Sequence, residues 1–373
     1  MKFNGDPLVN FLSEGMMTNF PAKQPISRRG LLRAAGAVGL TVPFGLIGAR
    51  ALAESDPLAH APICASPVQI ADAGGALKPI KLTWNANAIC TVAVPAADER
   101  GIFAKHGLSV ELVNFGGSTD QLLEAIATGK ADAGVGMALR WLKPLEQGFD
   151  VKLTAGLHGG CLRLLAGKNS GIASVADLKG KTVAVSDMAS PGKNFFSIVL
   201  KQQGLDPTKD VEWRQYPADL LGLAIQKGEA QALADGDPNT WLLRDNFDLV
   251  EVATNLSGDY QQRVCCIIGV RGSLIRQDRA TATAITQALL EAGAWVADNP
   301  DEAARIFAKY SKAPVSALTA MLRSQTHHHH PVGSDFRDEI ALYAGELKLV
   351  EVMKPSTDTA KFADKVYADV LSS

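Results

Sequence analysis

Residues 107–136 have the order strand, glycine turn, helix and strand, and this order constrains what the chain can fold into. Val110, Leu112 and Val113 belong to a short β-branched and apolar run, which predicts the first strand. Ser118, with Gln121 three residues later, has the spacing of a capping box and predicts that a helix begins there. The segment 116–119 is therefore expected where a strand ends and a helix begins, which is where open α/β sheets bind small ligands.

The end of this unit is repeated further along the chain. After a predicted helix, residues 129–135 have the order glycine, Lys, Ala, Asp, Ala and then a strand. Residues 228–234 repeat this order after another predicted helix, with Glu and Gln in place of Lys and Asp. The repeat predicts two related α/β units with matching loops. The chain has 37 basic and 39 acidic residues, a formal net charge of −2. This balance gives no indication of a nucleic-acid partner.

Residues 1–53 are predicted to be an export signal. Arg28 and Arg29 form a twin-arginine pair, a weakly apolar run follows to Ile47, and 51–53 has a small-x-small cleavage pattern. A soluble helix or an uncleaved membrane anchor are the alternatives, although glycines and a proline interrupt the apolar run. Residues 54–78 are Ala/Pro/Gly-rich and predict a linker.

Three motifs then resemble a known family. They are the run at 95–113, G-G-S-T-D at 116–120 and A-T-G-K-A-D-A-G at 127–134. They are similar to the periplasmic substrate-binding proteins of ABC importers, in the nitrate/sulfonate/bicarbonate branch that includes thiamine-precursor binders. The resemblance covers residues 81–301.

The resemblance implies a type II periplasmic-binding-protein clamshell, in which two α/β lobes are joined by a hinge. Lobe 1 is expected to be discontinuous, with residues 79–167 and 263–373, and lobe 2 to comprise residues 168–262. The hinge would close on a small, anionic, organic or inorganic solute and present it to a permease and ATPase complex at the inner membrane. The resemblance implies a periplasmic location, no cofactor and no enzymatic activity.

Candidate ligand contacts lie where strands pass into helices or crossovers. Asn85 and Asn87 offer amide groups, although asparagines also shape turns. Arg140 suits an anion, and Ser190 followed by Pro191 is a strong helix start. Asp235 and Asp237 would suit an amine, a hydroxyl or a metal better than an anion, so the sequence leaves the charge of the ligand open. The full set is Asn85, Asn87, Cys90, Gly117, Ser118, Thr119, Arg140, His158, Ser186, Ser190, Lys193, Asp235 and Asp237.

Cysteine and histidine residues suggest a further possibility. The odd number of cysteines, five, leaves at least one unpaired in a monomer. Cys90, Cys161 and one of Cys265 and Cys266 are expected near strand ends around the cleft, which allows a thiol-lined or soft-metal pocket. Only one of the adjacent pair is expected to face the cleft, because neighbouring residues of a strand point to opposite faces. Buried, inert thiols are the alternative.

The run His327, His328, His329 and His330 is an alternative metal site, or else a polar loop. Two alternatives to solute delivery therefore stay open. One is an enzyme that resembles the thiamine-pyrimidine synthase of the same fold family, which uses histidine and cysteine residues. The other is an exported metal-binding protein on the same clamshell.

Overall fold

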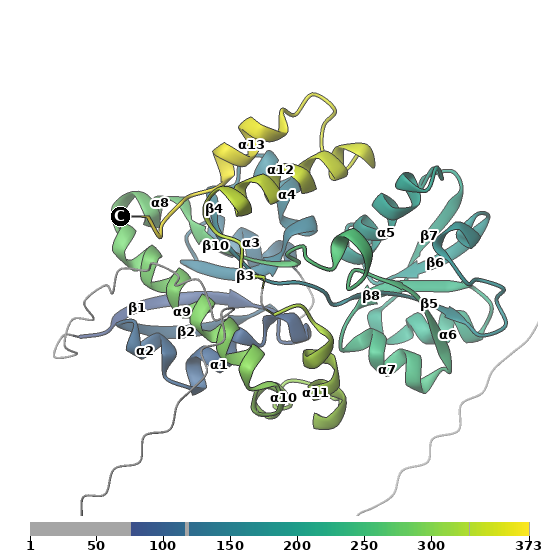
Figure 1. The fold of residues 1–373 in the computed structure, drawn as a ribbon, viewed down its shortest axis with the longest axis horizontal. Coiled ribbons are helices and arrows are strands. Elements are labelled where there is room, and N and C mark those ends of the chain that lie inside the picture. The colour runs from purple at the N-terminus through teal and green to yellow at the C-terminus, as the bar shows by residue number, and fades with distance from the viewer. Residues whose placement is uncertain (1–75, 116–118, 328, 373) are drawn as a thin grey trace, which may run out of the picture. The chain divides into compact units, whose positions relative to one another are not determined.

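The computed structural model describes residues 76–115, 119–327 and 329–372, which lie within the second of two compact units of the chain, residues 66–373 (Figure 1). The predicted export signal and all but the end of the predicted linker lie outside the described residues. Within the described ranges, no helix is long and apolar enough to cross a membrane.

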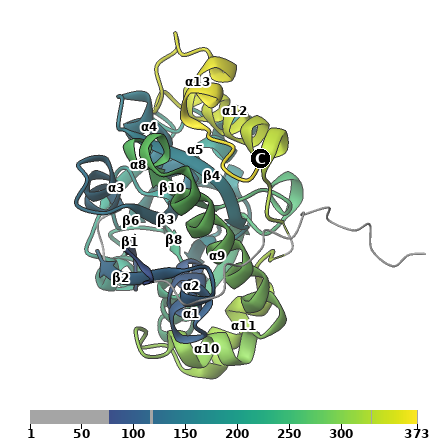
Figure 2. The same cartoon turned by 90° about the vertical axis from the view of Figure 1, so that its left-hand side faces the viewer.

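The first lobe is built on a five-stranded sheet with the strand order β2-β1-β3-β10-β4 (Figure 2). β1 is parallel to β2 and β3, whereas β10 is antiparallel to β3 and β4. Buried apolar side chains on these strands, such as Leu82, Val135 and Leu153, form the core of the lobe. The strands are β1 (Lys78–Trp84), β2 (Leu108–Asn114), β3 (Ala133–Met137), β4 (Val151–His158) and β10 (Cys266–Arg271).

Helices from both ends of the described chain cover this sheet. α9 packs against α1 and β4, and α12 packs against α13 (Figures 1 and 2). The helices are α1 (Ala93–Glu99), α2 (Ile102–Lys105), α3 (Thr119–Ala127), α4 (Ala138–Glu146), α8 (Gly272–Gln277), α9 (Arg279–Asp298), α10 (Pro300–Phe307), α11 (Val315–Ser324), α12 (Gly333–Leu349) and α13 (Thr359–Val366).

The second lobe repeats this plan. Its five-stranded sheet has the order β7-β6-β8-β5-β9, with β6 parallel to β7 and β8, and β5 antiparallel to β8 and β9. The prediction of two related α/β units is therefore confirmed. The elements are β5 (Leu162–Gly167), β6 (Lys181–Val185), β7 (Val211–Gln215), β8 (Ala232–Gly236), β9 (Leu249–Thr254), α5 (Pro191–Gln202), α6 (Leu221–Gln226) and α7 (Asn239–Asn246).

The boundary between the lobes differs from the expected one. The sequence placed residues up to 167 in lobe 1, but β5 pairs with β8 and β9, so residues 162–167 belong to the second sheet. The chain crosses between the sheets at 159–161 and returns at 255–265. The apolar pattern of a buried strand does not specify which sheet the strand joins, because it would suit either core.

Helix caps position several of these elements. The Ser190 hydroxyl accepts a hydrogen bond from the Lys193 N–H group at 3.2 Å, and α5 begins at Pro191 as predicted. The Asp278 carboxylate accepts from the hydroxyl (2.7 Å) and the N–H group (3.0 Å) of Thr281 at the start of α9, and it lies 3.0 Å from Lys78 Nζ. These contacts, led by the Thr281 hydroxyl, lower the pKa of Asp278 to about 2.

We expect Asp278→Ala to lower the free energy of unfolding by about 1 kcal/mol at neutral pH, because α9 loses its cap. The folded-state pKa of Asp278 is depressed. The stabilisation that the ionised Asp278 carboxylate provides is therefore present above the unfolded pKa of about 3.9. It disappears as the pH falls toward the folded-state pKa of about 2. Urea unfolding across this range measures the difference. Asp278→Asn is the control, because asparagine caps helices without titrating. Equal stability of parent and Asp278→Ala at neutral pH would contradict the prediction.

A buried ion pair in the second lobe links the start of β5 to the residue after β8. Arg163 on β5 donates from Nε to both carboxylate oxygens of Asp237, at 2.9 and 3.0 Å, and the Asp237 side chain is fully buried. Arg163 Nη1 also pairs with Glu251 on β9, whose side chain is 34% exposed. Asp237 also accepts from the Thr240 hydroxyl at 2.5 Å. Burial raises the pKa of Asp237, although Arg163 opposes this shift.

We expect Asp237→Ala to reduce the free energy of unfolding by about 3 kcal/mol, because it leaves the buried Arg163 guanidinium with an unpaired edge. Glu251→Ala is the matched control. It should cost less than about 1 kcal/mol, since its charge is partly solvated. Chemical denaturation of both variants provides the comparison, and equal losses would contradict the assignment of Asp237 as the main partner.

Candidate functional site

The loops at the carboxyl ends of strands in both sheets meet at a junction between the lobes. The N–H group of Ile89, after β1, donates to the carbonyl oxygen of Asp237, after β8, at 3.3 Å. The Asn194 side chain on α5 donates to the carbonyl oxygen of Leu139 on α4 at 3.0 Å. Both bonds join loops or helix starts, which is the position that the sequence predicted for ligand contacts.

Arg140 lies at the same junction and is 7% exposed. Its Nη2 lies 2.8 Å from Asp187 of the second lobe. Its Nε donates to Asp120, on α3 of the first lobe, at 2.8 Å, and Nη2 contacts the same carboxylate. Arg140 Nη1 is buried and has no hydrogen-bond partner among the described residues. Arg140 therefore links the lobes, and an incoming anion would meet a guanidinium that is already paired with two carboxylates.

The cavity at the junction is small. Its volume is about 10 Å³, which is room for one water molecule. Its walls come from both lobes and include Met137, Leu139, Pro191, Phe195, Cys265 and Tyr343. This cavity is therefore too small to hold a solute larger than water.

The first-lobe asparagines occupy a turn. The Asn85 side chain accepts from the Asn87 N–H group at 2.9 Å, and the Asn85 carbonyl accepts from the Thr91 hydroxyl at 2.8 Å. Asn85 therefore shapes the loop that carries Cys90, whereas Asn87 is exposed. Gly117 and Ser118 lie outside the described residues, as does the side chain of Thr119, where α3 begins.

The second-lobe candidates divide into two groups. Asp235, at the end of β8, contacts the Ser186 hydroxyl at 3.2 Å and accepts from Asn239 Nδ2 at 2.8 Å, and burial raises its pKa. Lys193 lies instead with Nζ 5.5 Å from the ring centre of Trp213, on edge strand β7, and burial lowers its pKa. Ser186 and Asp235 thus form one polar cluster with Asn239, while Lys193 packs on the sheet of its own lobe.

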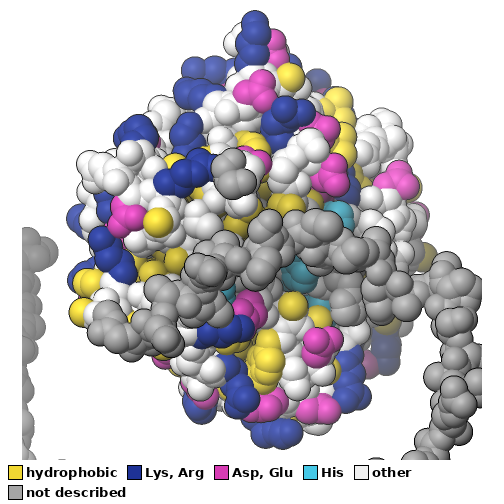
Figure 3. Space-filling view, turned by 60° about the vertical axis from the view of Figure 1, so that its left-hand side comes forward, with side chains coloured by type: hydrophobic (Ala, Val, Ile, Leu, Met, Phe, Trp, Pro, Cys, Tyr) yellow, Lys and Arg dark blue, Asp and Glu magenta, His cyan; other side chains and the backbone are white. Residues whose placement is uncertain are grey.

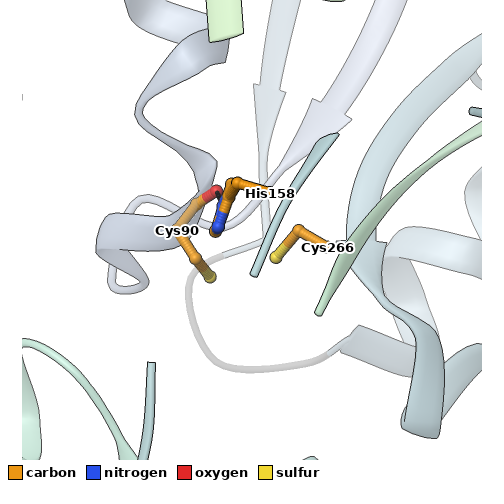
Figure 4. Close-up of side chains that lie close together, drawn as sticks. All are labelled: Cys90, His158 and Cys266. Atoms are coloured by element: carbon orange, nitrogen blue, oxygen red, sulfur yellow. Dashed lines mark hydrogen bonds between the residues drawn. The ribbon is translucent and has the colours of Figure 1, made fainter. Parts of the chain in front are cut away.

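Three side chains able to ligate a metal converge beside the junction (Figure 4). They are Cys90, His158 and Cys266, whose sulfur and ring nitrogen atoms lie within 4.8 Å of one another. Cys90 follows β1, His158 ends β4 and Cys266 begins β10. All three side chains are buried, with 4% exposure or less.

Two further thiols complete this cluster, because Cys161 and Cys265 are buried with their sulfur atoms 4.0 Å apart. Hydrogen bonds from Cys161 and Cys266 lower the pKa of the Cys90 thiol. Hydrogen bonds from the same two thiols lower the pKa of Cys265. The four buried thiols are therefore neighbours in one cluster. The sequence predicted that only one of Cys265 and Cys266 faces the cleft; in the structure both thiols are buried in this cluster, and Cys265 also lines the junction cavity.

The histidine run does not form one site in the part of the chain that is described. His327 contacts the Leu322 carbonyl oxygen, and His329 lies 3.3 Å from Glu339. His328 lies outside the described residues. His327 does approach the cysteine cluster, since the centre of its ring is 6.2 Å from that of His158.

Known structures share this fold. The periplasmic aliphatic sulphonate-binding protein SsuA of Escherichia coli is 18% identical, with a TM-score of 0.66 over 78% of this chain and 92% of that chain. A zinc-bound ligand-binding component of an ABC-type import system from Staphylococcus aureus is 14% identical, with a TM-score of 0.65 over 79% and 97%. The periplasmic nitrate-binding protein NrtA of Synechocystis PCC 6803 is 17% identical, with a TM-score of 0.64 over 79% and 87%.

These likenesses establish the periplasmic-binding-protein fold, in agreement with the two mixed sheets described above. No curated protein matches the sequence at a significant level. The family model described as NMT1/THI5 like matches residues 91–303, which is more than half of the chain. The chain therefore belongs to the NMT1/THI5-like family.

Proposed function

We propose that this protein is an exported solute-binding protein that captures a small solute between its lobes and delivers it to an ABC importer. Its partners would be the permease and ATPase complex at the inner membrane, and its location periplasmic. The observation that carries the proposal is the junction, where polar groups at the strand ends of two separate sheets face each other. Two crossings of the chain connect these sheets, an arrangement suited to hinge closure.

The proposed solute is small and anionic, and organic or inorganic. Arg140 supports this proposal, because its buried Nη1 could donate to a solute oxygen. Asp120 and Asp187 reduce the positive charge there, so the solute would displace or rearrange a carboxylate. Structures with the same fold are binding components for sulphonate and nitrate in E. coli and Synechocystis. We propose binding without bond cleavage and without a cofactor.

The proposed contacts remain the residues that the sequence indicated around the junction. Asp237 and Lys193 are weaker members, because one is committed to Arg163 and the other packs on Trp213. Acidic and basic side chains are intermixed over the face shown in Figure 3, so that face offers no field of one sign to attract nucleic acid.

We expect native mass spectrometry of the protein, purified without added ligand or chelator, to show a small mass that leaves on mild denaturation. Thermal-shift measurements with sulfonates, nitrate, bicarbonate and thiamine-precursor pyrimidines then identify the class. Arg140→Lys should weaken binding at least about tenfold, because lysine cannot reproduce the fork of the guanidinium.

Arg323→Lys is the matched control, since Arg323 is an exposed residue that pairs with Asp301. It should bind the solute as the parent does. Conversion of a bound solute into a product would favour the synthase-like enzyme instead. Unchanged solute affinity of Arg140→Lys would exclude Arg140 from the site.

Export is proposed to use the twin-arginine machinery. Replacing Arg28 and Arg29 with lysines should leave the protein in the cytoplasm, because the pair is read by the export receptor. Cell fractionation and immunoblotting provide the measurement, with Arg33→Lys as the control outside the pair. Export of the Lys-Lys variant at the parent level would contradict this route.

A further inference from the structure

The cysteine cluster beside the junction is formed by residues that are distant in the sequence. Cys90 comes from the loop after β1, Cys161 from the first crossing, and Cys265 and Cys266 from the end of the second. The sulfur atoms of Cys161 and Cys265 lie 4.0 Å apart, and those of Cys90 and Cys266 lie within 4.8 Å of each other. A single buried cysteine is usually a small apolar filler. Four thiols that converge with an imidazole from three separate segments need a further explanation.

The spacing of the cluster fits a metal ion. Two sulfurs that each lie about 2.3 Å from a tetrahedral ion are about 3.8 Å apart. The observed separation of Cys161 and Cys265 is 4.0 Å, and the donor atoms of Cys90, His158 and Cys266 lie within 4.8 Å of one another. Small side-chain rotations would bring these donors onto one ion, and Figure 4 shows the three labelled side chains directed toward a common space.

His158 adds an independent indication. Its Nδ1 lies 3.1 Å from the Gly159 carbonyl oxygen, and its Nε2 contacts the Cys90 carbonyl oxygen. A neutral imidazole has one N–H donor and one lone pair. In the neutral form, one of its nitrogens would therefore direct a lone pair at a carbonyl oxygen, which is unfavourable. Turning that lone pair toward a metal ion removes the conflict, while the other nitrogen keeps its hydrogen bond.

The donor types select the class of ion. Thiolate sulfur favours Cu⁺ and Zn²⁺, imidazole suits zinc and copper, and the cluster itself holds no carboxylate, the ligand that hard cations prefer.

We propose that Cys90, His158 and Cys266, with one thiol of the neighbouring Cys161–Cys265 pair as a fourth donor, form a binding site for a thiophilic d¹⁰ metal ion, Zn²⁺ or Cu⁺. The site goes beyond the solute-binding function and does not depend on the identity of the solute. Cys90 lies on a first-lobe loop and His158 and Cys266 lie on first-lobe strands, whereas Cys161 and Cys265 lie on the two crossings of the chain. A bound ion would therefore tie the hinge to the first lobe and stabilise the closed junction, and the ion would enter only when the buried site opens.

The test uses the full chain, reduced, stripped of metal and kept anaerobic. It is titrated with Co²⁺ as a spectroscopic probe for Zn²⁺, with Zn²⁺ itself, and with Cu⁺ against a chromophoric chelator. We expect one ion per chain, thiolate-to-cobalt charge-transfer absorption, and a higher melting temperature with the preferred ion. Cys90→Ser and Cys266→Ser should weaken binding at least about 100-fold, since loss of even an outer contact costs about 10- to 100-fold.

Two matched controls separate the cluster from other donors. Cys64→Ser removes the fifth cysteine, and His106→Gln removes a histidine that pairs with Glu291. Both should bind as the parent does. Melting curves of the metal-free variants establish folding, and His158→Gln replaces any cysteine variant that does not fold.

Binding of neither ion by the reduced parent would overturn the proposal, as would unchanged affinity in Cys90→Ser and Cys266→Ser. Protein that is isolated with a Cys161–Cys265 disulfide, and binds no ion after reduction, would assign these thiols to a redox pair instead. Solute thermal shifts on the metal-free parent are measured separately, so that failure of the metal site and failure of solute binding are distinguishable.

Discussion

The arrangement of the molecule depends on the contacts between its two sheets, which combine polar pairs with a shared apolar core. The two sheets share no strand, so no backbone ladder joins them. The described chain crosses between them twice. The lobes therefore meet through contacts such as Arg140 with Asp187 and Asn194 with Leu139. Ion pairs and side-chain hydrogen bonds of this kind can be exchanged for contacts to a ligand, whereas a sheet cannot be opened at similar cost.

The same junction brings together two kinds of chemistry. On one side, a guanidinium with an unused buried N–H group lies between carboxylates from both lobes. On the other, four thiols and an imidazole gather where the chain passes between the sheets. Cys265 lines the small junction cavity as well as belonging to the sulfur cluster.

Individual candidates show how far the sequence could define the site. Ser190 was recognised as the start of a helix, and its hydroxyl caps α5. Asp237 follows a strand end as a ligand residue would, yet its partner is Arg163, 74 residues earlier, which local patterns do not reveal. Lys193 lies in the first turn of α5, but its ammonium group packs against Trp213. Position along the chain was predictable, whereas the direction of each side chain was not.

The sequence by itself determined the alternation of strands and helices, their caps and the presence of two related α/β units, because periodicity, capping and glycine turns act over a few residues. Only the tertiary structure decided that β5 belongs to the second sheet and that Cys90 meets Cys266, 176 positions later. Such contacts depend on which faces the whole chain buries together. An apolar strand or a cysteine carries no local signal of its distant partner.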